Sequence, residues 1–311
     1  EASEVLSRAI ELAPNYVPAI YELTRAIFNS PVRDQAAEFD EKDRRARALV
    51  DRMVELAPDS SYANGWLSTF ALEEGDLQVA ALYRERAVAG AVDSDLYLQQ
   101  AMAARFLAQL GRLKEAAALA RYVVDRDPAC ISCVSSLSYI LRQAGSHREA
   151  AETLEKLRKW RDLSARMYWN MGVAWLVAGE PGKSLEYFDK TWPGNRELGK
   201  MLALHDLGRV DEFEAEFSKL RKDPETHPES IARIYAWTGQ NDLAFEYIER
   251  TVDREGPGIV LSLSTDLYEP IKSDSRWQNL LSRYDVAEED LARIRFNPKL
   301  PAEVEAALAG K

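Results

Sequence analysis

The sequence has few of the side chains that build metal and catalytic sites. Its 311 residues include two cysteines and three histidines. The histidines His147, His205 and His227 lie far apart, so nothing joins Cys130 and Cys133 to complete the four ligands of a structural zinc site. No glycine-rich phosphate loop, nucleophile elbow or HExxH pattern occurs. We therefore expect no enzymatic activity, no metal and no cofactor.

An excess of positive charge and long apolar runs are also missing. The formal net charge is -11 and the isoelectric point about 5.0, which opposes general attraction to nucleic acid. No apolar run approaches the roughly 20 residues of a membrane span. Apolar residues at 46% and charged residues at 29% are typical of globular proteins. We expect a soluble protein, cytoplasmic rather than periplasmic, that binds no nucleic acid through this segment.

The sequence does contain a repeated motif. Residues 111–128, GRLKEAAALARYVVDRDP, combine a glycine turn, an amphipathic helix and a proline stop. The glycine recurs at spacings of 36, 34, 34, 29 and 31 residues, which predicts stacked pairs of helices. In each pair a first helix, helix A, stops at the glycine because glycine accepts a left-handed backbone, and helix B follows. The glycines are Gly75, Gly111, Gly145, Gly179, Gly208 and Gly239, and the residues five positions later are Ala80, Ala116, Ala150, Ser184, Phe213 and Ala244.

The repeat predicts the order of helices along the chain. Residues 1–14 have the pattern of a helix B without its helix A, so we expect the chain to be part of a larger protein. After residue 252 the periodicity ends, and residues 259–264 could form a short strand, although we favour irregular structure because no partner strand is visible. The expected pairs are 17–29 with 36–56, three regular units at 61–89, 97–128 and 131–161, a unit at 165–191, and units at 195–220 and 228–252 with clipped first helices; short helices at 275–284 and 288–294 follow.

The two cysteines stand in PACISC at the predicted start of a helix. Their three-residue spacing places both on one face near the positive end of the helix dipole, which can lower the pKa of a thiol. One interpretation is a redox pair or half of a metal site. The interpretation that we favour is a pair of small packing residues, because no second Cys or His pair completes a zinc set.

One unit carries a family resemblance. It spans residues 165–191, ARMYWNMGVAWLVAGEPGKSLEYFDKT, in which Gly172 lies inside a helix and predicts a close helix crossing. Residues 1–252 resemble tetratricopeptide repeat (TPR) proteins. The resemblance implies an all-α, right-handed superhelical solenoid of antiparallel helix pairs, with about seven to eight units, the first truncated, and an irregular helical cap at 253–311. The positions that match the family pattern are Tyr168, Met171, Gly172, Trp175, Gly179, Ser184 and Phe188.

The end of the chain resembles a narrower group. The segment DLYEPIKSDSRWQNLLSRYDV is similar to the tail that follows TPR arrays in bacterial multidomain signalling and transcription regulators. Such tails cap the last repeat, so the resemblance implies an interaction or sensing module within a larger regulator. The matching residues are Leu267, Pro270, Ile271, Asp274, Arg276, Trp277, Leu280 and Leu281.

The TPR resemblance also implies a binding surface. In that family the A helices line a concave groove, and this acidic chain places arginines and aromatic residues at the positions that face it. Arginine pairs with carboxylates, so an acidic peptide or a free C-terminal carboxylate is the expected ligand, although the match to the family's carboxylate clamp is partial. The alternative is that the arginines form ion pairs within the chain and the tryptophans are packing residues. The candidate partner-binding residues are Arg105, Tyr139, Arg142, Arg166, Trp169, Asn170, Arg233 and Trp237.

Three hypotheses about function follow. The first is a noncatalytic scaffold that binds a protein or peptide segment in the groove. The second is a domain that senses a small molecule in the groove or near residues 195–252 and controls an attached output domain; it would need a closed pocket of about 300 to 1,000 Å³. The third is self-association through the face of residues 15–29.

Overall fold

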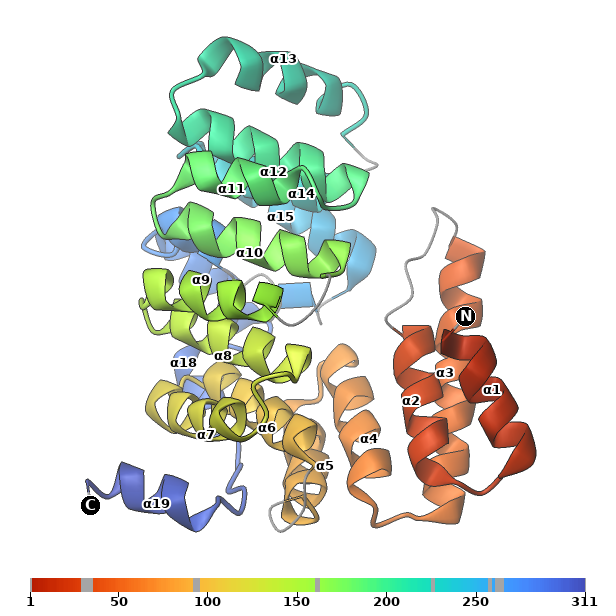
Figure 1. Ribbon diagram of the computed structural model, residues 1–311. Helices are drawn as coiled ribbons and strands as arrows, with labels where there is room; N and C mark the ends of the chain where they lie inside the picture. Colours follow the sequence, from red (N-terminus) through yellow and green to blue (C-terminus); the bar gives the residue numbers. More distant parts are fainter. Residues whose placement is uncertain are drawn as a thin grey trace. The chain divides into compact units, whose positions relative to one another are not determined.

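The structure is a computed structural model that describes residues 2–28, 36–91, 96–159, 163–224, 227–256, 259–260 and 266–310. Its contacts define two compact units, which we describe separately. The first contains Glu1–Gln99 with Arg295–Leu300, and the second contains Gln100–Ile294 with Pro301–Lys311. Every regular element within the described ranges is a helix, in agreement with the expected all-α fold (Figure 1).

The first unit is built from two helix pairs around an aromatic core. Trp66 is 6% exposed and lies in ring contact with Tyr21, Phe28 and Phe70, at centroid distances of 6.3, 4.9 and 5.8 Å. These rings come from both pairs, so the core joins one repeat to the next. The helices are α1 (Ala2–Leu12), α2 (Val17–Phe28), α3 (Ala36–Leu56), α4 (Ser61–Glu73), α5 (Leu77–Ala89) and the first residues of α6 (Tyr97–Gln109).

The second unit continues the same alternation of A and B helices. Its larger core includes Phe188, Phe217 and Tyr235, all buried between successive pairs. The elements after α6 are α7 (Leu113–Arg126), α8 (Ile131–Gln143), α9 (His147–Glu155), η1 (Lys156–Lys159), α10 (Ala165–Val177), α11 (Pro181–Phe188), α12 (Pro193–Asp206), α13 (Val210–Leu220), α14 (Pro228–Trp237), α15 (Asn241–Glu255), η2 (Asp266–Ile271), α17 (Ser275–Arg283), α18 (Glu288–Leu291) and α19 (Ala302–Leu308).

The predicted glycine turns are confirmed at all six positions. Each glycine has a φ between 68° and 81°, the left-handed region that disfavours a side chain. The residue after each glycine donates its N–H to the carbonyl five positions earlier, at 2.8 to 3.0 Å, which is the Schellman closure of helix A. Five residues beyond the glycine, the alanines and Ser184 are 0% exposed, so helix B approaches helix A closely there.

Gly172 marks a close helix crossing, as its place inside a helix predicts. A Cβ on Gly172 of α10 would lie 2.4 Å from Cε1 of Phe188, and a Cβ on Gly199 of α12 would lie 2.4 Å from Cδ1 of the same ring. Phe188 of α11 is 0% exposed. The phenyl ring therefore fills a slot between two A helices that exists only because both positions lack a side chain.

The A helices of the last two pairs, α12 and α14, differ in length. The expected clipping of the first helix in 195–220 is wrong, because α12 has 14 residues and begins at Pro193, which suits the first turn of a helix. Helix α14, with 10 residues, is the shortened one. Residues 259–260 are helical, and the rest of the segment considered as a strand lies outside the described residues.

The tail motif docks on the last helix pair. Asp274 caps α17 by accepting the N–H of Arg276 at 3.0 Å, and the Arg276 guanidinium reaches Asp242 of α15 at 2.8 Å. Trp277 is 2% exposed, and its ring lies 5.9 Å from that of Tyr268 in η2. Hydrogen bonding by Arg276 lowers the pKa of Asp274 well below its usual range. The residues that carry the resemblance are therefore the ones that attach the tail.

The sequence patterns did not predict where the chain goes after α18. Residues 295–300 have no regular secondary structure and belong to the first unit. Phe296 is 1% exposed, the N–H of Arg295 donates to Gln78 of α5 at 3.4 Å, and the N–H of Asn297 donates to Glu85 of the same helix. A segment more than 200 residues later in sequence thus completes the packing of α5.

Helix α19 belongs to the second unit and was not predicted either. It packs on α7, where Arg126 pairs with Glu303 at 2.9 Å and Val304 is 2% exposed. Its seven residues are too few for a helical repeat to be visible in the sequence.

Candidate binding surface on the A helices

Three consecutive A helices of the second unit bring arginines together. Arg105 of α6 lies over the ring of Tyr139 of α8, with its guanidinium carbon 4.1 Å from the ring centroid. Arg142 of α8 and Arg166 of α10 lie close enough to act electrostatically on Arg105. We call Arg105, Tyr139, Arg142 and Arg166 the arginine cluster. Four of the eight residues predicted from sequence therefore gather on adjacent repeats.

The position of Arg105 is electrostatically costly. Burial lowers the pKa of its guanidinium, Tyr139 opposes that effect, and the positive charges of Arg142 and Arg166 lower the pKa further. Among the residues that the structure describes, no carboxylate contacts Arg105. The Arg105 guanidinium is thus partly desolvated and lies near two like charges, and a carboxylate placed beside it would favour its charged form.

Asn170 adds an amide to the same surface. It lies on α10 one turn after Arg166 and donates from Nδ2 to the hydroxyl of Ser135 on α8 at 3.1 Å. This bond fixes the side chain across two A helices. Within the described part of the chain no donor bonds to Oδ1 of Asn170, so that oxygen can accept a hydrogen bond from a peptide N–H.

The other three predicted residues have partners inside the chain. Trp169 packs against Phe188 with a centroid distance of 5.4 Å, and Arg233 forms an ion pair with Glu229 one turn earlier on α14. The indole Nε1 of Trp237 donates to Asp206 at 2.8 Å. These contacts occupy the three side chains within the chain, and the bond of Trp237 joins two successive A helices.

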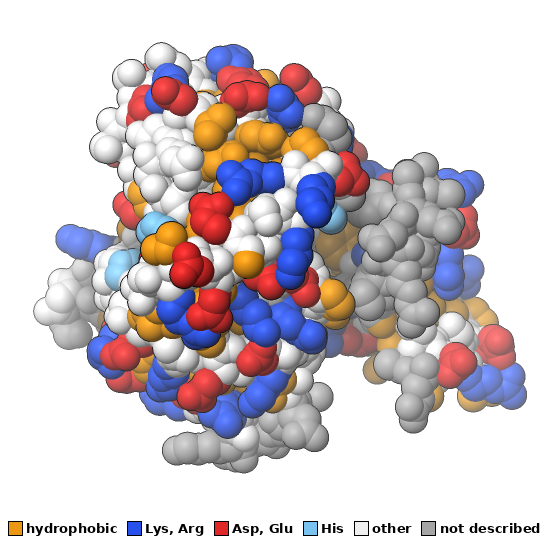
Figure 2. Space-filling view, turned by 90° about the horizontal axis from the view of Figure 1, so that it is seen from above, with side chains coloured by type: hydrophobic (Ala, Val, Ile, Leu, Met, Phe, Trp, Pro, Cys, Tyr) orange, Lys and Arg blue, Asp and Glu red, His pale blue; other side chains and the backbone are white. Residues whose placement is uncertain are grey.

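Other arginines pair with an acid about one repeat away. Arg47 bonds Glu74, 27 residues later, and the same pattern recurs along the second unit. Lys and Arg side chains are accordingly interspersed with Asp and Glu on the surface in Figure 2. The environment of Arg105 differs from this pattern. The further pairs are Arg121 with Glu149, Arg148 with Glu180 and Arg283 with Glu249, at 3.0, 2.6 and 2.8 Å.

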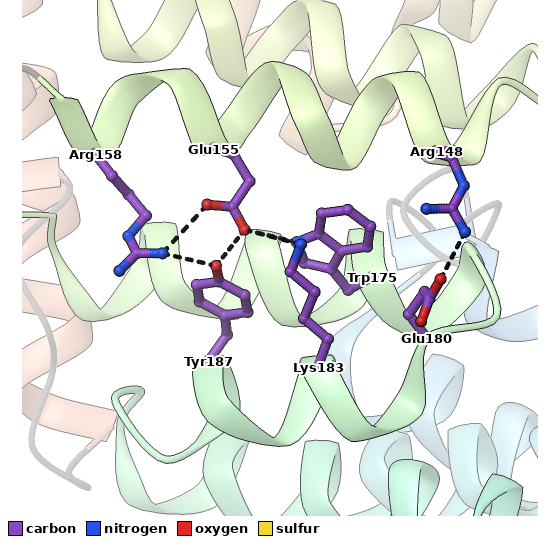
Figure 3. A network of polar contacts seen from close by, with 7 residues as sticks. All are labelled: Arg148, Glu155, Arg158, Trp175, Glu180, Lys183 and Tyr187. Atoms are coloured by element: carbon purple, nitrogen blue, oxygen red, sulfur yellow. Dashed lines mark hydrogen bonds and ion pairs between the residues drawn. The ribbon is translucent and has the colours of Figure 1, made fainter.

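Sequence reasoning missed a polar network between α9, α10 and α11 (Figure 3). Its centre is Glu155, which accepts hydrogen bonds from the Tyr187 hydroxyl, from Trp175 Nε1 at 3.0 Å and from Arg158 at 3.3 Å. The ammonium group of Lys183 lies 3.6 Å from the Glu155 carboxylate and 3.3 Å from the centroid of a Trp175 ring. Trp175 is one of the residues that match the family pattern, whereas Tyr187 is not, and only the structure reveals that both donate to the same carboxylate.

The pKa values define the chemistry of this network. Burial raises the pKa of Glu155, but the hydrogen bonds from Tyr187, Trp175 and Arg158 outweigh burial and lower it. Burial and the bond to Glu155 raise the pKa of Tyr187 well above its usual value. At neutral pH the carboxylate is therefore a fixed acceptor and the phenol a fixed donor, which suits a structural connection between repeats rather than proton transfer.

A depression of about 530 Å³ lies at the start of α15. Its lining includes Gly239, Asn241, Asp242 and Arg276, and the Asp242 side chain is 94% exposed. It is open to solvent and lined by polar groups. It therefore does not enclose a small molecule as the sensing hypothesis requires.

The cysteine pair is a disulfide. Cys130 and Cys133 are bonded, with Cα atoms 5.2 Å apart. Cys130 is the N-cap of α8 and its sulfur accepts the N–H of Cys133 at 3.2 Å, while Cys133 is 1% exposed. The interpretation as two packing residues holds only for Cys133, because three-residue spacing in the first turn brings the two sulfurs into bonding range.

The described residues offer neither a metal site nor a membrane-spanning helix. No group of three or more His, Cys, Asp or Glu side chains there has the geometry of a metal site. None of the helices described is both long enough and apolar enough to span a membrane.

The repeated helix pairs, each closed by a left-handed glycine, define the class of helical-repeat proteins. Residues 137–195 match the tetratricopeptide repeat family profile. This stretch of the chain therefore contains tetratricopeptide repeat sequence, in agreement with the resemblance described above. No curated protein sequence matches the chain.

Solved structures with a similar arrangement include several TPR proteins. A TPR protein from Parabacteroides merdae has 17% identity and a TM-score of 0.46, with 80% of this chain and 97% of that one covered. PilF of Pseudomonas aeruginosa has 16% identity and a TM-score of 0.47, covering 66% and 90%. YrrB, described as a TPR protein with an unusual peptide-binding site, has 19% identity and a TM-score of 0.35, covering 65% and 97%.

Proposed function

We propose that this chain is a noncatalytic scaffold that binds an acidic protein or peptide segment along its A helices. The arginine cluster receives the carboxylates of the segment, and Asn170 bonds its backbone. Residues 1–252 form the repeat array in this proposal, residues 253–311 cap it, and the whole chain serves as the interaction module of a larger regulator.

The observation that carries the proposal is the environment of Arg105. Its guanidinium lies over the Tyr139 ring, no carboxylate among the described residues contacts it, and two further arginines act on it. Arginines elsewhere, such as Arg121 and Arg148, form ion pairs with a carboxylate about one repeat away. Arg105 has no such carboxylate among the described residues. A carboxylate from a partner would complete the cluster with charge-assisted hydrogen bonds, each contributing about 1.5 to 3 kcal/mol.

The test is a binding assay with synthetic peptides. We would use ten-residue fluorescein-labelled peptides with three acidic residues and a free C-terminal carboxylate, and measure anisotropy at 50 and 200 mM salt. Replacing Arg105 by Gln should weaken binding about 10- to 100-fold, as expected for the loss of one charge-assisted bond. Peptides with lysine in place of each acid should not bind.

Arg121→Gln is the matched control, because it removes the same charge from α7, where Arg121 already pairs with Glu149. Binding by this variant should remain within about 2-fold of wild type, as expected for an exposed ion pair. Equal losses in the two variants would indicate general charge attraction and would refute the proposed site. A second peptide with an amidated C-terminus distinguishes side-chain carboxylates from a terminal carboxylate as the ligand.

A further inference from the structure

We infer that the Cys130–Cys133 disulfide is an exchangeable redox site that reacts with dithiols through Cys130. The inference is independent of peptide binding. The chain has two cysteines and both belong to this pair, so the site has no competing thiol within the molecule.

The first argument is that the bond adds little to the fold. It joins two residues of one helical turn, whereas a stabilising disulfide closes a long loop or ties separate elements. The same turn is already held by the bond from the Val134 N–H to the Cys130 carbonyl at 3.0 Å. Neither α7 nor α9 is connected to α8 by the disulfide. The bond is therefore not required to hold repeats together.

The second argument is that the two sulfurs are unequal. Cys133 is 1% exposed and faces the interior, whereas Cys130 is half-buried at the helix start. An incoming thiolate can therefore reach the sulfur of Cys130 and not that of Cys133. Cys130 therefore supplies the sulfur that is attacked, and Cys133 supplies the sulfur that leaves.

The third argument is that the released Cys130 thiolate has a donor in place. The N–H of Cys133 already points at the Cys130 sulfur from 3.2 Å, as expected of an N-cap. A thiolate would accept this bond more strongly than a disulfide sulfur does, and the helix start adds a favourable dipole. The reduced form thus keeps the cap of α8, and the helix need not unwind when the disulfide opens.

The exchange proceeds in two steps. A thiolate of a dithiol reductant attacks the Cys130 sulfur, the Cys130–Cys133 bond breaks, and Cys133 leaves as a thiolate that takes a proton from water. In the mixed disulfide the first sulfur of the reductant is bonded to Cys130. The second thiolate of the reductant attacks that first sulfur and releases Cys130 as a thiolate. Two electrons pass from the dithiol to the chain, which gains two thiols while the reductant becomes a disulfide.

The experiment uses the full chain and two variants. Cys130→Ser leaves Cys133 alone and retains a good N-cap, and Cys133→Ala leaves Cys130 alone without burying a new polar group. Each variant is treated with oxidised glutathione and, separately, with the chromogenic disulfide DTNB. Cys133→Ala should form the glutathione adduct and react with DTNB at least 10-fold faster than Cys130→Ser, which should react fully only after denaturation.

The wild-type chain gives the second readout. Under native conditions dithiothreitol should reduce the bond completely, as two alkylated cysteines in the mass spectrum. The Tm should change by less than about 2 °C, equivalent to about 1 kcal/mol for a chain of this length. Circular dichroism of both variants verifies that they are folded. Resistance of the native disulfide to dithiothreitol, a larger loss of Tm on reduction, or equal DTNB rates in the folded variants would overturn the inference.

Discussion

The slot that holds Phe188 provides the sharpest test of the packing argument. Replacing glycine by alanine inside a helix normally stabilises it by about 1 kcal/mol. At Gly172 the new Cβ would lie 2.4 Å from the Phe188 ring, well inside the 3.5 to 4.0 Å of an ordinary carbon contact. We therefore expect Gly172→Ala to lower the free energy of unfolding.

The magnitude follows from the absence of space on the other side of the ring. Phe188 is 0% exposed, and it lies equally close to the Cβ position of Gly199, so the ring cannot move away from α10 without meeting α12. Overpacking of a filled core costs about 1 to 3 kcal/mol. After subtraction of the helix gain, Gly172→Ala should destabilise the chain by up to about 2 kcal/mol.

The assay is urea denaturation followed by circular dichroism, with Gly182→Ala as the matched control. Gly182 is also helical, on α11, but a Cβ there meets no atom within 4 Å. The control should gain up to about 1 kcal/mol, so the two variants should differ by about 1 to 3 kcal/mol, the cost of overpacking itself. Adding Phe188→Leu should cost less in the Gly172→Ala background than in wild type. Equal stabilisation by both alanines would refute the interpretation of Phe188 as a ring held between two glycines.

Three further predictions concern other parts of the chain. Hydrogen bonding lowers the folded pKa of Glu155, so the stability that this carboxylate contributes is present above its unfolded pKa of about 4.5 and is lost as the pH falls through its folded pKa. In thermal melts, the Tm difference between wild type and Glu155→Gln should therefore narrow between pH 7 and pH 3. Arg84 is 3% exposed, contacts no acid among the described residues and has a pKa lowered to about 10 by burial, so Arg84→Met should leave the urea midpoint unchanged or raise it, and a loss above about 2 kcal/mol would contradict this reasoning. Phe296→Ala should cost about 3 to 5 kcal/mol and increase hydrogen exchange in α5, whereas protection of α5 equal to wild type would argue against the packing of the C-terminal segment.

Local signals explain what the sequence predicts well. A glycine at a helix end and an alanine five residues later report the backbone and the packing of their own turn, so the helix order and the six left-handed turns follow from the pattern. Gly172 predicts a close crossing for the same reason. The residue that Gly172 contacts in that crossing, Phe188, lies on the next helix, α11, of the same helix pair.

Contacts between distant segments leave no comparable signal. Nothing in FNPKLP predicts that Phe296 will be buried near α5, because the pairing depends on where the chain returns. The candidate site contains both local contacts and contacts between distant segments. The pairing of Arg233 with Glu229 is local, one helical turn apart, and can be seen in the sequence. The approach of Arg142 and Arg166 to Arg105 joins three different helices and is visible only in the structure.

The contact of residues 295–300 with α5 has a consequence for biosynthesis. Helix α5 leaves the ribosome more than 200 residues before the segment that donates to Gln78 and Glu85. At about 5 to 20 residues per second, α5 is synthesised roughly 10 to 40 seconds before residues 295–297. Repeat arrays are expected to fold by adding each unit to its neighbour, but here the unit that contains α5 is completed by residues translated more than 200 positions later. Partial chains released from the ribosome before residue 295 would therefore leave Gln78 and Glu85 of α5 without these backbone donors.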